Sequence, residues 1–341
     1  MALEDIGFYT LTDERARSAS ASSPLSRCEL ILTSACNFRC PYCRGLSEGQ
    51  RGSIDPAAAM ETVRLWCAHG LRNVRFSGGE PTMYRGLHDL VRYCRDHGVE
   101  RIALSTNGSA DVSVYRELVS AGVNDFSVSL DGGCCSTGDA MTGGVVGAWE
   151  TVTDSIRAMA DMTYVTAGMV FTEANVGQCV DAVLFAASLG VSDVRVIPSA
   201  QYNQALAMLS GLPDAALERL PILKYRIQNI RGGRHVRGIG GDVRDRCWLA
   251  LDDMAVVQGK HYPCVIYLRE GGEAIGRVGQ RMRQERAEWV ERHEPWSDPI
   301  CRGNCLDVCQ DYNRRFRELQ GVEGRDRRSP RARAGGIRRL G

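Results

Sequence analysis

Short apolar runs alternate with amphipathic stretches along the first 200 residues of the chain. The apolar runs, which are typical of buried strands, lie at 28–33, 74–76, 102–104, 126–130, 164–171 and 194–197. The stretches between them have helical spacing of apolar residues, and several end at a glycine: 56–70, 87–94, 114–119, 149–159 and 180–189. Repeated strand–helix units predict a parallel sheet covered by helices. We therefore expect an α/β, barrel-like fold whose functional site lies at the carboxyl ends of the strands.

The pattern changes after about residue 205. Residues 254–257 alternate like a strand and a turn follows at 258–260, so a β-hairpin is expected there. Residues 302–316 have a periodicity compatible with a helix that puts Cys301, Cys305 and Cys309 near one face. The expected organisation is an N-terminal extension (1–27), a barrel (28–205), a connector of helix and loop (206–240), a small domain of hairpin plus helix (241–318) and a disordered basic tail (319–341).

Composition narrows the class of protein. The 341 residues are 44% hydrophobic, enough for a sizeable core, and the formal net charge is +1. Residues 325–341 carry seven Arg and one Asp, so this tail could contact nucleic acid. The basic loop 231–237 could bind a phosphate or carboxylate, although solvated charge is the commoner explanation of such a loop. The sequence has fourteen cysteines but no evident signal peptide and no membrane-spanning apolar run. We expect a cytoplasmic protein whose thiolates bind metal.

Three cysteines, Cys36, Cys40 and Cys43, follow the first predicted strand at very tight spacing. The loop is too short for a strain-free disulfide. Three thiolates could hold three irons of a [4Fe-4S] cluster, which is ordinarily bound by four cysteines, and would leave one iron open to a small molecule. A zinc site is the alternative, although the closest histidine in the sequence is His69.

This cysteine run resembles the CxxxCxxC signature of radical S-adenosylmethionine (SAM) enzymes, with the aromatic Tyr42 before the last cysteine. Residues 77–81 (Ser-Gly-Gly-Glu-Pro), 105–108 and 127–131 resemble further motifs of that superfamily in the same order. The resemblance implies a partial (β/α)6 TIM-like barrel and a [4Fe-4S] cluster that binds SAM, takes an electron from a flavodoxin- or ferredoxin-type donor and yields a 5′-deoxyadenosyl radical. It assigns SAM binding to Gly78, Gly79, Glu80, Ser105, Asn107 and Ser129, with Glu80 or the Gly79 carbonyl accepting a hydrogen bond from the SAM amino group. Such residues are also common in ordinary turns.

A second group of cysteines lies in the C-terminal third. Cys247 and Cys264, with Gly259 between them, resemble the opening of SPASM and twitch domains, which carry auxiliary iron–sulfur clusters. On that resemblance we expect one auxiliary [4Fe-4S] cluster held by Cys247, Cys264, Cys301 and Cys305. The Cys-x3-Cys-x3-Cys spacing departs from the usual pattern, so Cys309 could replace Cys305 as the last ligand. Four of these thiolates could instead bind zinc.

Other cysteines are candidate hydrogen-atom donors. Cys134 and Cys135 follow the fourth predicted strand, where paired thiols could face a substrate as an epimerase would require. Two small, semi-buried residues are the simpler explanation of this pair. Cys309 could act as a donor if it is not a cluster ligand.

Together these features predict a radical SAM enzyme that abstracts hydrogen from a small molecule, such as a sugar, a cyclitol or a nucleotide-like compound. The auxiliary cluster would accept an electron or anchor the substrate. The alternatives are a peptide-modifying maturase, an enzyme that modifies bases in nucleic acid, and a non-catalytic iron–sulfur or zinc protein. The intact Gly78-Gly79-Glu80 motif argues against the non-catalytic alternative.

Overall fold

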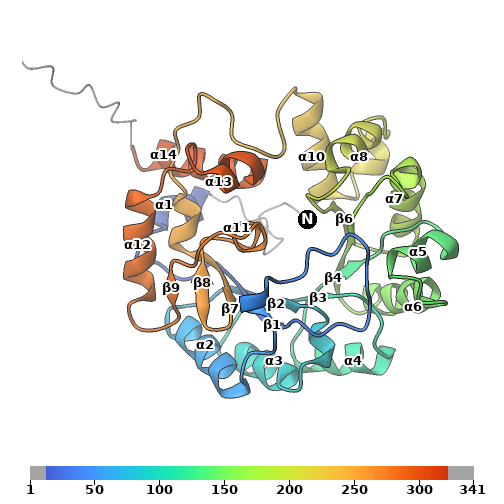
Figure 1. Cartoon of the computed structure of the whole chain (residues 1–341), viewed down its shortest axis with the longest axis horizontal. Coiled ribbons are helices and arrows are strands. Elements are labelled where there is room, and N and C mark those ends of the chain that lie inside the picture. The colour runs from blue at the N-terminus through green and yellow to red at the C-terminus, as the bar shows by residue number, and fades with distance from the viewer. Residues whose placement is uncertain (1–12, 322–341) are drawn as a thin grey trace, which may run out of the picture.

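The computed structural model describes residues 13–321. The expected basic tail is outside this range from residue 322 onwards, as is the first part of the expected N-terminal extension. Within the described range, a curved sheet forms the centre of the molecule and helices cover its outer side (Figure 1). None of these helices has the length and apolar character needed to cross a membrane.

Six strands pair in parallel in the order in which they occur along the chain. They are β1 (Arg27–Thr33), β2 (Asn73–Gly78), β3 (Arg101–Thr106), β4 (Asp125–Ser129), β5 (Tyr164–Met169) and β6 (Asp193–Val196). Each coincides with a predicted strand to within a few residues. The α/β fold and the six-unit partial barrel are therefore confirmed.

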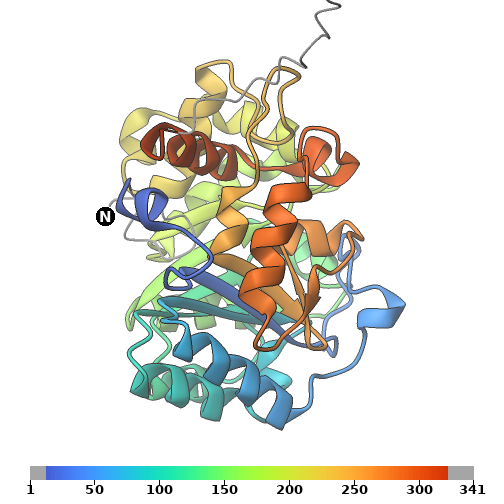
Figure 2. The ribbon, with the colours of Figure 1, turned by 90° about the vertical axis from the view of Figure 1, so that its left-hand side faces the viewer.

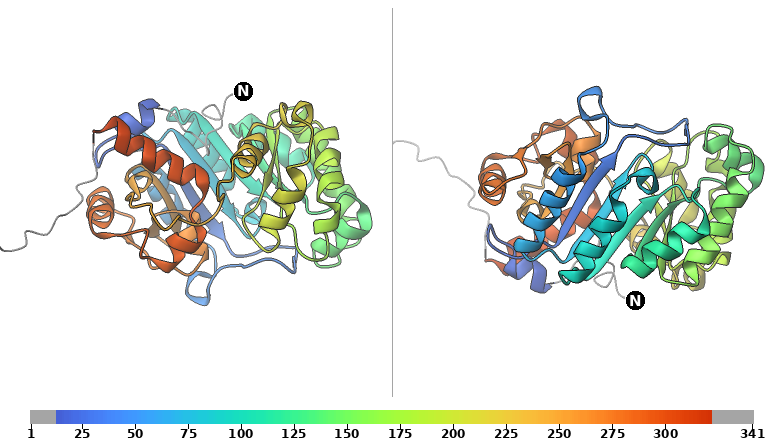
Figure 3. Two further views of the ribbon diagram at one scale, coloured as in Figure 1. Left: turned by 90° about the horizontal axis from the view of Figure 1, so that it is seen from above. Right: turned by 90° about the horizontal axis from the view of Figure 1, so that it is seen from below.

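Helices connect these strands and follow one another around the outer side of the sheet (Figures 1 and 3). They are α2 (Pro56–Ala68), α3 (Leu87–Asp96), α4 (Val112–Ala121), α5 (Cys135–Met141), α6 (Ala148–Ala160) and α7 (Cys179–Ser188). The first begins where the sequence indicates, because the Asp55 side chain accepts hydrogen bonds from the Ala57 and Ala58 N–H groups and Pro56 occupies the first turn. The connector contains α8 (Tyr202–Leu209), α9 (Asp214–Leu217) and α10 (Pro221–Arg231).

The alternation of side chains along each strand separates an apolar outer layer from a polar interior. In β2, Val74 and Phe76 are fully buried in the main hydrophobic core, and Arg75 alternates with them. In β6, Val194 and Val196 belong to the same core and Arg195 lies between them. The interior of this partial barrel is thus not packed with branched apolar side chains, as in a complete barrel, and can hold a polar ligand.

The C-terminal part of the chain extends the barrel sheet. Strand β7 (Asp253–Val257) pairs in parallel with β1, and β8 (Lys260–Tyr262) and β9 (Gly276–Arg277) continue antiparallel, which gives the order β6-β5-β4-β3-β2-β1-β7-β8-β9. The expected hairpin is present, but it belongs to the same nine-stranded sheet as the barrel. Helix α11 (Val265–Arg269) follows β8, and α12 (Met282–Arg292) lies against this end of the sheet (Figure 2).

The expected single helix over 302–316 is wrong. Two helices, α13 (Pro299–Asn304) and α14 (Asp307–Leu319), are separated at Cys305 and Leu306, whose backbones are extended. Leu306 forms an isolated bridge with Arg237, and this pairing takes it out of the helical conformation. Helix α14 packs against α1 (Asp13–Ser18), and Arg15 of α1 forms a buried ion pair with Asp252.

Candidate active site

The first cysteine motif lies over the carboxyl ends of the strands. Cys36, Cys40 and Cys43, on the loop between β1 and α2, line a cavity of about 510 Å³. That volume is typical of a small-molecule site. The cavity is also lined by five of the residues for which SAM binding was predicted: Gly78, Gly79, Ser105, Asn107 and Ser129.

Close backbone contact joins the cysteine loop to the end of β2. The Gly79 N–H donates to the Thr33 carbonyl at 2.7 Å, and the Glu80 N–H donates to the Ala35 carbonyl at 2.8 Å. A β-carbon on residue 79 would overlap the Ala35 carbonyl, so only glycine allows this approach. The glycine motif therefore fixes the loop that carries the cysteines.

Glu80 has a different place from the one expected. Its side chain is buried and does not line the cavity. One carboxylate oxygen accepts the Asn107 N–H at 2.7 Å, and the other accepts hydrogen bonds from Thr82 and Thr106. These hydrogen bonds use both carboxylate oxygens, so Glu80 stabilises the turn after β3. Gly79 and Asn107, not Glu80, line the cavity.

Asn107 and Tyr42 tie the cysteine loop to neighbouring strands. The Asn107 side-chain amide lies 3.7 Å from the Cys36 sulfur and donates to Asn37 at 2.8 Å. The Tyr42 hydroxyl donates to Asp131, whose other oxygen accepts the Val170 N–H at 2.6 Å. Burial raises the pKa of Asp131 to about 6. Sequence reasoning gave Asp131 no role, because its partner Tyr42 is 89 residues away.

A second cavity, of about 390 Å³, adjoins the first and shares part of its wall, including Tyr42, Cys43, Ser105 and Ser129. Its lining carries two acidic residues, Glu29 and Asp253, against six arginines: Arg27, Arg44, Arg75, Arg195, Arg237 and Arg269. Sequence reasoning singled out the basic loop 231–237, which contains Arg237, but missed the other five arginines. The signal was present in Arg75 and Arg195, which are charged residues inside predicted strands.

Several of the arginines already have carboxylate partners. Arg27 pairs with Asp253, and Arg44 and Arg237 pair with Glu270. Arg195 donates to Ser127 and Arg269 donates to the Gly45 carbonyl, and neither forms an ion pair with another residue of the described range. The Nε of Arg195 is buried, with no hydrogen-bond partner in that range. The cavity therefore has a cationic surplus suited to an anion.

The second cysteine group is also gathered in space. Cys247, Cys264, Cys301, Cys305 and Cys309 all line one small cavity beside α11, α13 and α14. Cys264 and Cys309 line the arginine-rich cavity as well. Two of the five thiols thus line a cavity that Cys43 of the first cysteine motif also lines.

The thiols of neither group are gathered as closely as the ligands of a single zinc ion. Zn–S bonds of about 2.3 Å would bring tetrahedral ligands to roughly 3.8 Å of one another. Among residues 13–321, no three of the eight cysteines lie within 4.8 Å of one another; the single group of three that does combines Cys301 with His293 and Asp298. A cube of four irons holds its ligands further apart than one ion does.

The paired cysteines are not at either cavity. Cys134 and Cys135 are exposed at the start of α5, and neither lines the cavities described above. Ser136 and Thr137 lie within hydrogen-bond reach of the Cys134 sulfur and lower its pKa to about 7. Of the three candidate hydrogen-atom donors, only Cys309 lines one of these cavities.

Comparison with known families assigns the barrel. The Radical SAM superfamily profile matches residues 30–183. The chain is 35% identical to GTP 3′,8-cyclase of Synechococcus sp. (strain CC9902) over 127 residues, which cover 36% of this chain and 36% of that protein. It is 27% identical to probable GTP 3′,8-cyclase of Saccharolobus solfataricus over 179 residues, or 51% of this chain and 57% of that protein. The matches thus span between about a third and somewhat over half of these curated relatives.

Solved structures share the fold. Histidine-tagged anSMEcpe with bound AdoMet aligns with a TM-score of 0.58 at 16% identity, over 87% of this chain and 96% of that one. SuiB of Streptococcus suis bound to the precursor peptide SuiA aligns with a TM-score of 0.56 at 14% identity, over 87% of this chain and 70% of that one. At such identities the likeness concerns the fold alone.

Radical SAM proteins use a [4Fe-4S] cluster and S-adenosylmethionine. The expected motifs, their positions at the strand ends and the family match agree over the same segment. Residues 30–183 of this chain form a Radical SAM superfamily domain.

Proposed function

We propose that this protein is a radical SAM enzyme that acts on a small, anionic, nucleotide-like substrate, with an auxiliary [4Fe-4S] cluster beside the substrate. The observation that carries the proposal is the arginine-rich cavity between the two cysteine groups. Cys43 lies on one wall of this cavity, and Cys264 and Cys309 lie on another. A substrate bound in this cavity would lie close to both cysteine groups.

Cys36, Cys40 and Cys43 would hold the SAM-binding cluster. Gly79 and Asn107 would contact SAM in the cavity of about 510 Å³, with Ser105 and Ser129 on its floor. When bound, the cluster and SAM together supply a 5′-deoxyadenosyl radical by one-electron reductive cleavage of SAM. Residues of the chain would orient the cluster and SAM. Glu80 holds Asn107 in place by accepting its N–H, and the Tyr42 hydroxyl joins the cysteine loop to Asp131.

Arg195 and Arg269 would bind the anionic end of the substrate. A guanidinium binds phosphate or carboxylate through two parallel hydrogen bonds, and its attraction to the anion is stronger in a partly buried site, where the local dielectric is lower. The curated relatives are named for GTP, a nucleoside triphosphate, and this agrees with a cationic cavity. Cys247, Cys264, Cys301 and either Cys305 or Cys309 would hold the auxiliary cluster.

The test is the release of 5′-deoxyadenosine from SAM by anaerobically reconstituted protein under a strong reductant. We expect GTP to stimulate the release and guanosine, which lacks phosphates, to leave it near the basal rate. Arg195→Gln should raise the GTP concentration needed for half-maximal stimulation by roughly tenfold or more, since a hydrogen bond to a charged group contributes about 1.5–3 kcal/mol.

Arg157→Gln is the matched control. Arg157 is exposed on α6 and pairs with Asp154, and it does not line the cavity. This variant should behave like wild type. Protein with a full complement of iron that releases no 5′-deoxyadenosine would overturn the proposed activity. Equal stimulation by GTP and guanosine would overturn the anionic substrate while leaving the radical chemistry in place.

A further inference from the structure

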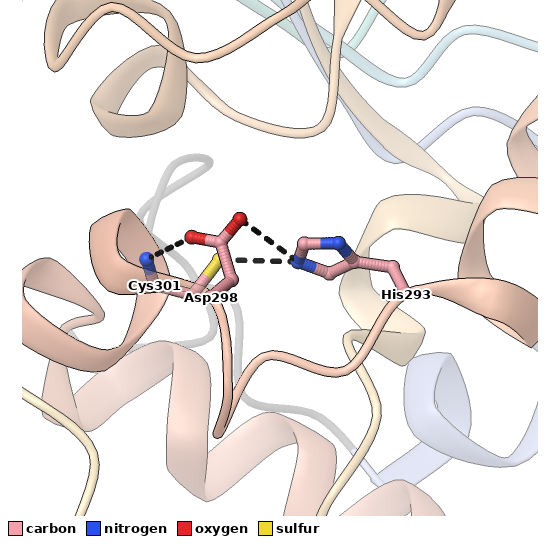
Figure 4. Close-up of side chains that lie close together, drawn as sticks. All are labelled: His293, Asp298 and Cys301. Atoms are coloured by element: carbon pink, nitrogen blue, oxygen red, sulfur yellow. Dashed lines mark hydrogen bonds and ion pairs between the residues drawn. The ribbon is translucent and has the colours of Figure 1, made fainter.

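His293, at the end of α12, lies against one of the proposed auxiliary ligands. Its Nε2 is 3.5 Å from the Cys301 sulfur (Figure 4). The histidine comes from a different element, since Cys301 lies on α13. Sequence spacing alone gave no reason to join the two.

The imidazole is held in place from several sides. It stacks on Trp289, with ring centroids 4.0 Å apart and an interplanar angle of 17°. Tyr267 meets it edge-on at 5.9 Å. Only 13% of the His293 side chain is exposed. A ring fixed in this way presents Nε2 to the sulfur without a further loss of freedom.

Asp298 completes the arrangement, and its hydrogen bonds decide what His293 does. One carboxylate oxygen accepts the Cys301 N–H at 2.8 Å and caps α13, and the other accepts the Tyr267 hydroxyl at 3.1 Å. His293, Asp298 and Cys301 come close enough to hold a single metal ion. The Nε2 of His293 also faces the Asp298 carboxylate, but at 4.0 Å, which is beyond hydrogen-bond distance, so the Cys301 sulfur at 3.5 Å is its hydrogen-bond partner (Figure 4).

We propose that His293 is a positioning residue for the auxiliary cluster, donating its Nε2–H to the Cys301 sulfur and raising the reduction potential of that cluster. A ligating thiolate can only accept, so the nitrogen that faces it must be the donor. Hydrogen bonds to cluster sulfurs are among the features that set iron–sulfur potentials. Such a bond stabilises the more negative, reduced state, which raises the potential. The inference rests on the proposed function, because it requires an auxiliary cluster bound by Cys301.

The experiment uses full-length protein in which Cys36, Cys40 and Cys43 are all replaced by alanine, so that the auxiliary cluster alone contributes. Its midpoint potential is measured by redox titration followed by electron paramagnetic resonance. His293→Phe keeps a ring to stack on Trp289 but removes the N–H, and we expect a lower potential. His293→Gln restores an N–H donor and should return the potential towards that of the background protein.

His97→Phe is the matched control. His97 also stacks on an aromatic ring, that of Tyr93 at 3.8 Å, but it belongs to the end of α3 and lines none of the three cavities. Its replacement should leave the potential unchanged.

An unchanged potential in His293→Phe, with the iron content retained, would overturn the inference. Loss of iron in both His293 variants would also overturn it, because His293 would then be a ligand. A background protein without any cluster would refute the proposed auxiliary cluster before His293 is changed, so the two failures are distinguishable.

Discussion

Two neighbouring residues, Gly79 and Glu80, support the cysteine loop in different ways. Residue 79 must be glycine because its backbone lies directly against the Ala35 carbonyl. Glu80 is required by hydrogen bonding, because its carboxylate accepts the Asn107 N–H from below the cavity. The sequence motif identified both residues but not this division, since burial and partner geometry decide which side chain faces a ligand.

Gly79→Ala should disturb the first cluster site. The added methyl group must push the Ala35 carbonyl aside, and such overpacking costs typically about 1–3 kcal/mol. We expect a several-fold weaker affinity for SAM in an anaerobic equilibrium-binding assay. Gly49→Ala is the control, because a β-carbon there has nothing within 4 Å. Equal affinities in the two variants would contradict the role given to Gly79.

Single substitutions can decide whether Cys305 or Cys309 is the fourth ligand of the proposed auxiliary cluster. Cys309 lines both the arginine-rich cavity and the small cysteine cavity, and Cys305 lines the latter alone. Retention of Cys305 as the ligand predicts that Cys309→Ala keeps the full iron content and that Cys305→Ala loses about four irons per chain. Iron and sulfide analysis of the two variants decides this, and the opposite pattern would make Cys309 the ligand and exclude it as a hydrogen donor.

At the scale of elements, the strands were predictable and the break in the last helix was not. Apolar alternation placed all six barrel strands, because each buries one face under helices regardless of distant contacts. The interruption at Cys305 and Leu306 depends on a bridge to Arg237, which lies far earlier in the chain. The parallel pairing of β7 with β1 is likewise a contact between distant segments that local periodicity does not encode.

One element contact predicts a pH dependence of stability. Asp193 of β6 is fully buried and accepts the Ile222 N–H at 2.7 Å, so it caps α10 from the sheet. Burial raises its pKa to about 7, whereas an unfolded aspartate titrates near about pH 4. The folded protein therefore holds this proton more tightly. The resulting stabilisation is complete below about pH 4 and is lost as the pH rises towards about 7.

Asp193→Asn removes this titration and keeps an oxygen acceptor. Urea unfolding at about pH 5 and about pH 7.5 should show that wild type gains stability relative to the variant at the lower pH. A difference between the two proteins that does not change with pH would contradict the assignment. Exposed Asp154 on α6, replaced by Asn, provides the comparison, since its side chain is 73% exposed.

For the whole molecule, the position of β1 explains how the two cysteine groups come to line adjoining cavities. β1 leads directly into the loop that carries Cys36, Cys40 and Cys43, and it pairs in parallel with β7, which lies between Cys247 and Cys264 in the chain. The C-terminal part is in this way built onto the barrel, and two of its cysteines, Cys264 and Cys309, line the arginine-rich cavity. We therefore expect one chain to hold two clusters beside one anion-binding cavity.

The most direct test is iron and sulfide content with Mössbauer spectra of anaerobically reconstituted protein. Wild type is compared with the variant in which Cys36, Cys40 and Cys43 are all alanine. We expect about eight irons per chain in wild type and about four in the variant, with spectra of [4Fe-4S] clusters in both. About four irons in wild type and none in the variant would contradict it, because the second cysteine group would then hold no iron–sulfur cluster.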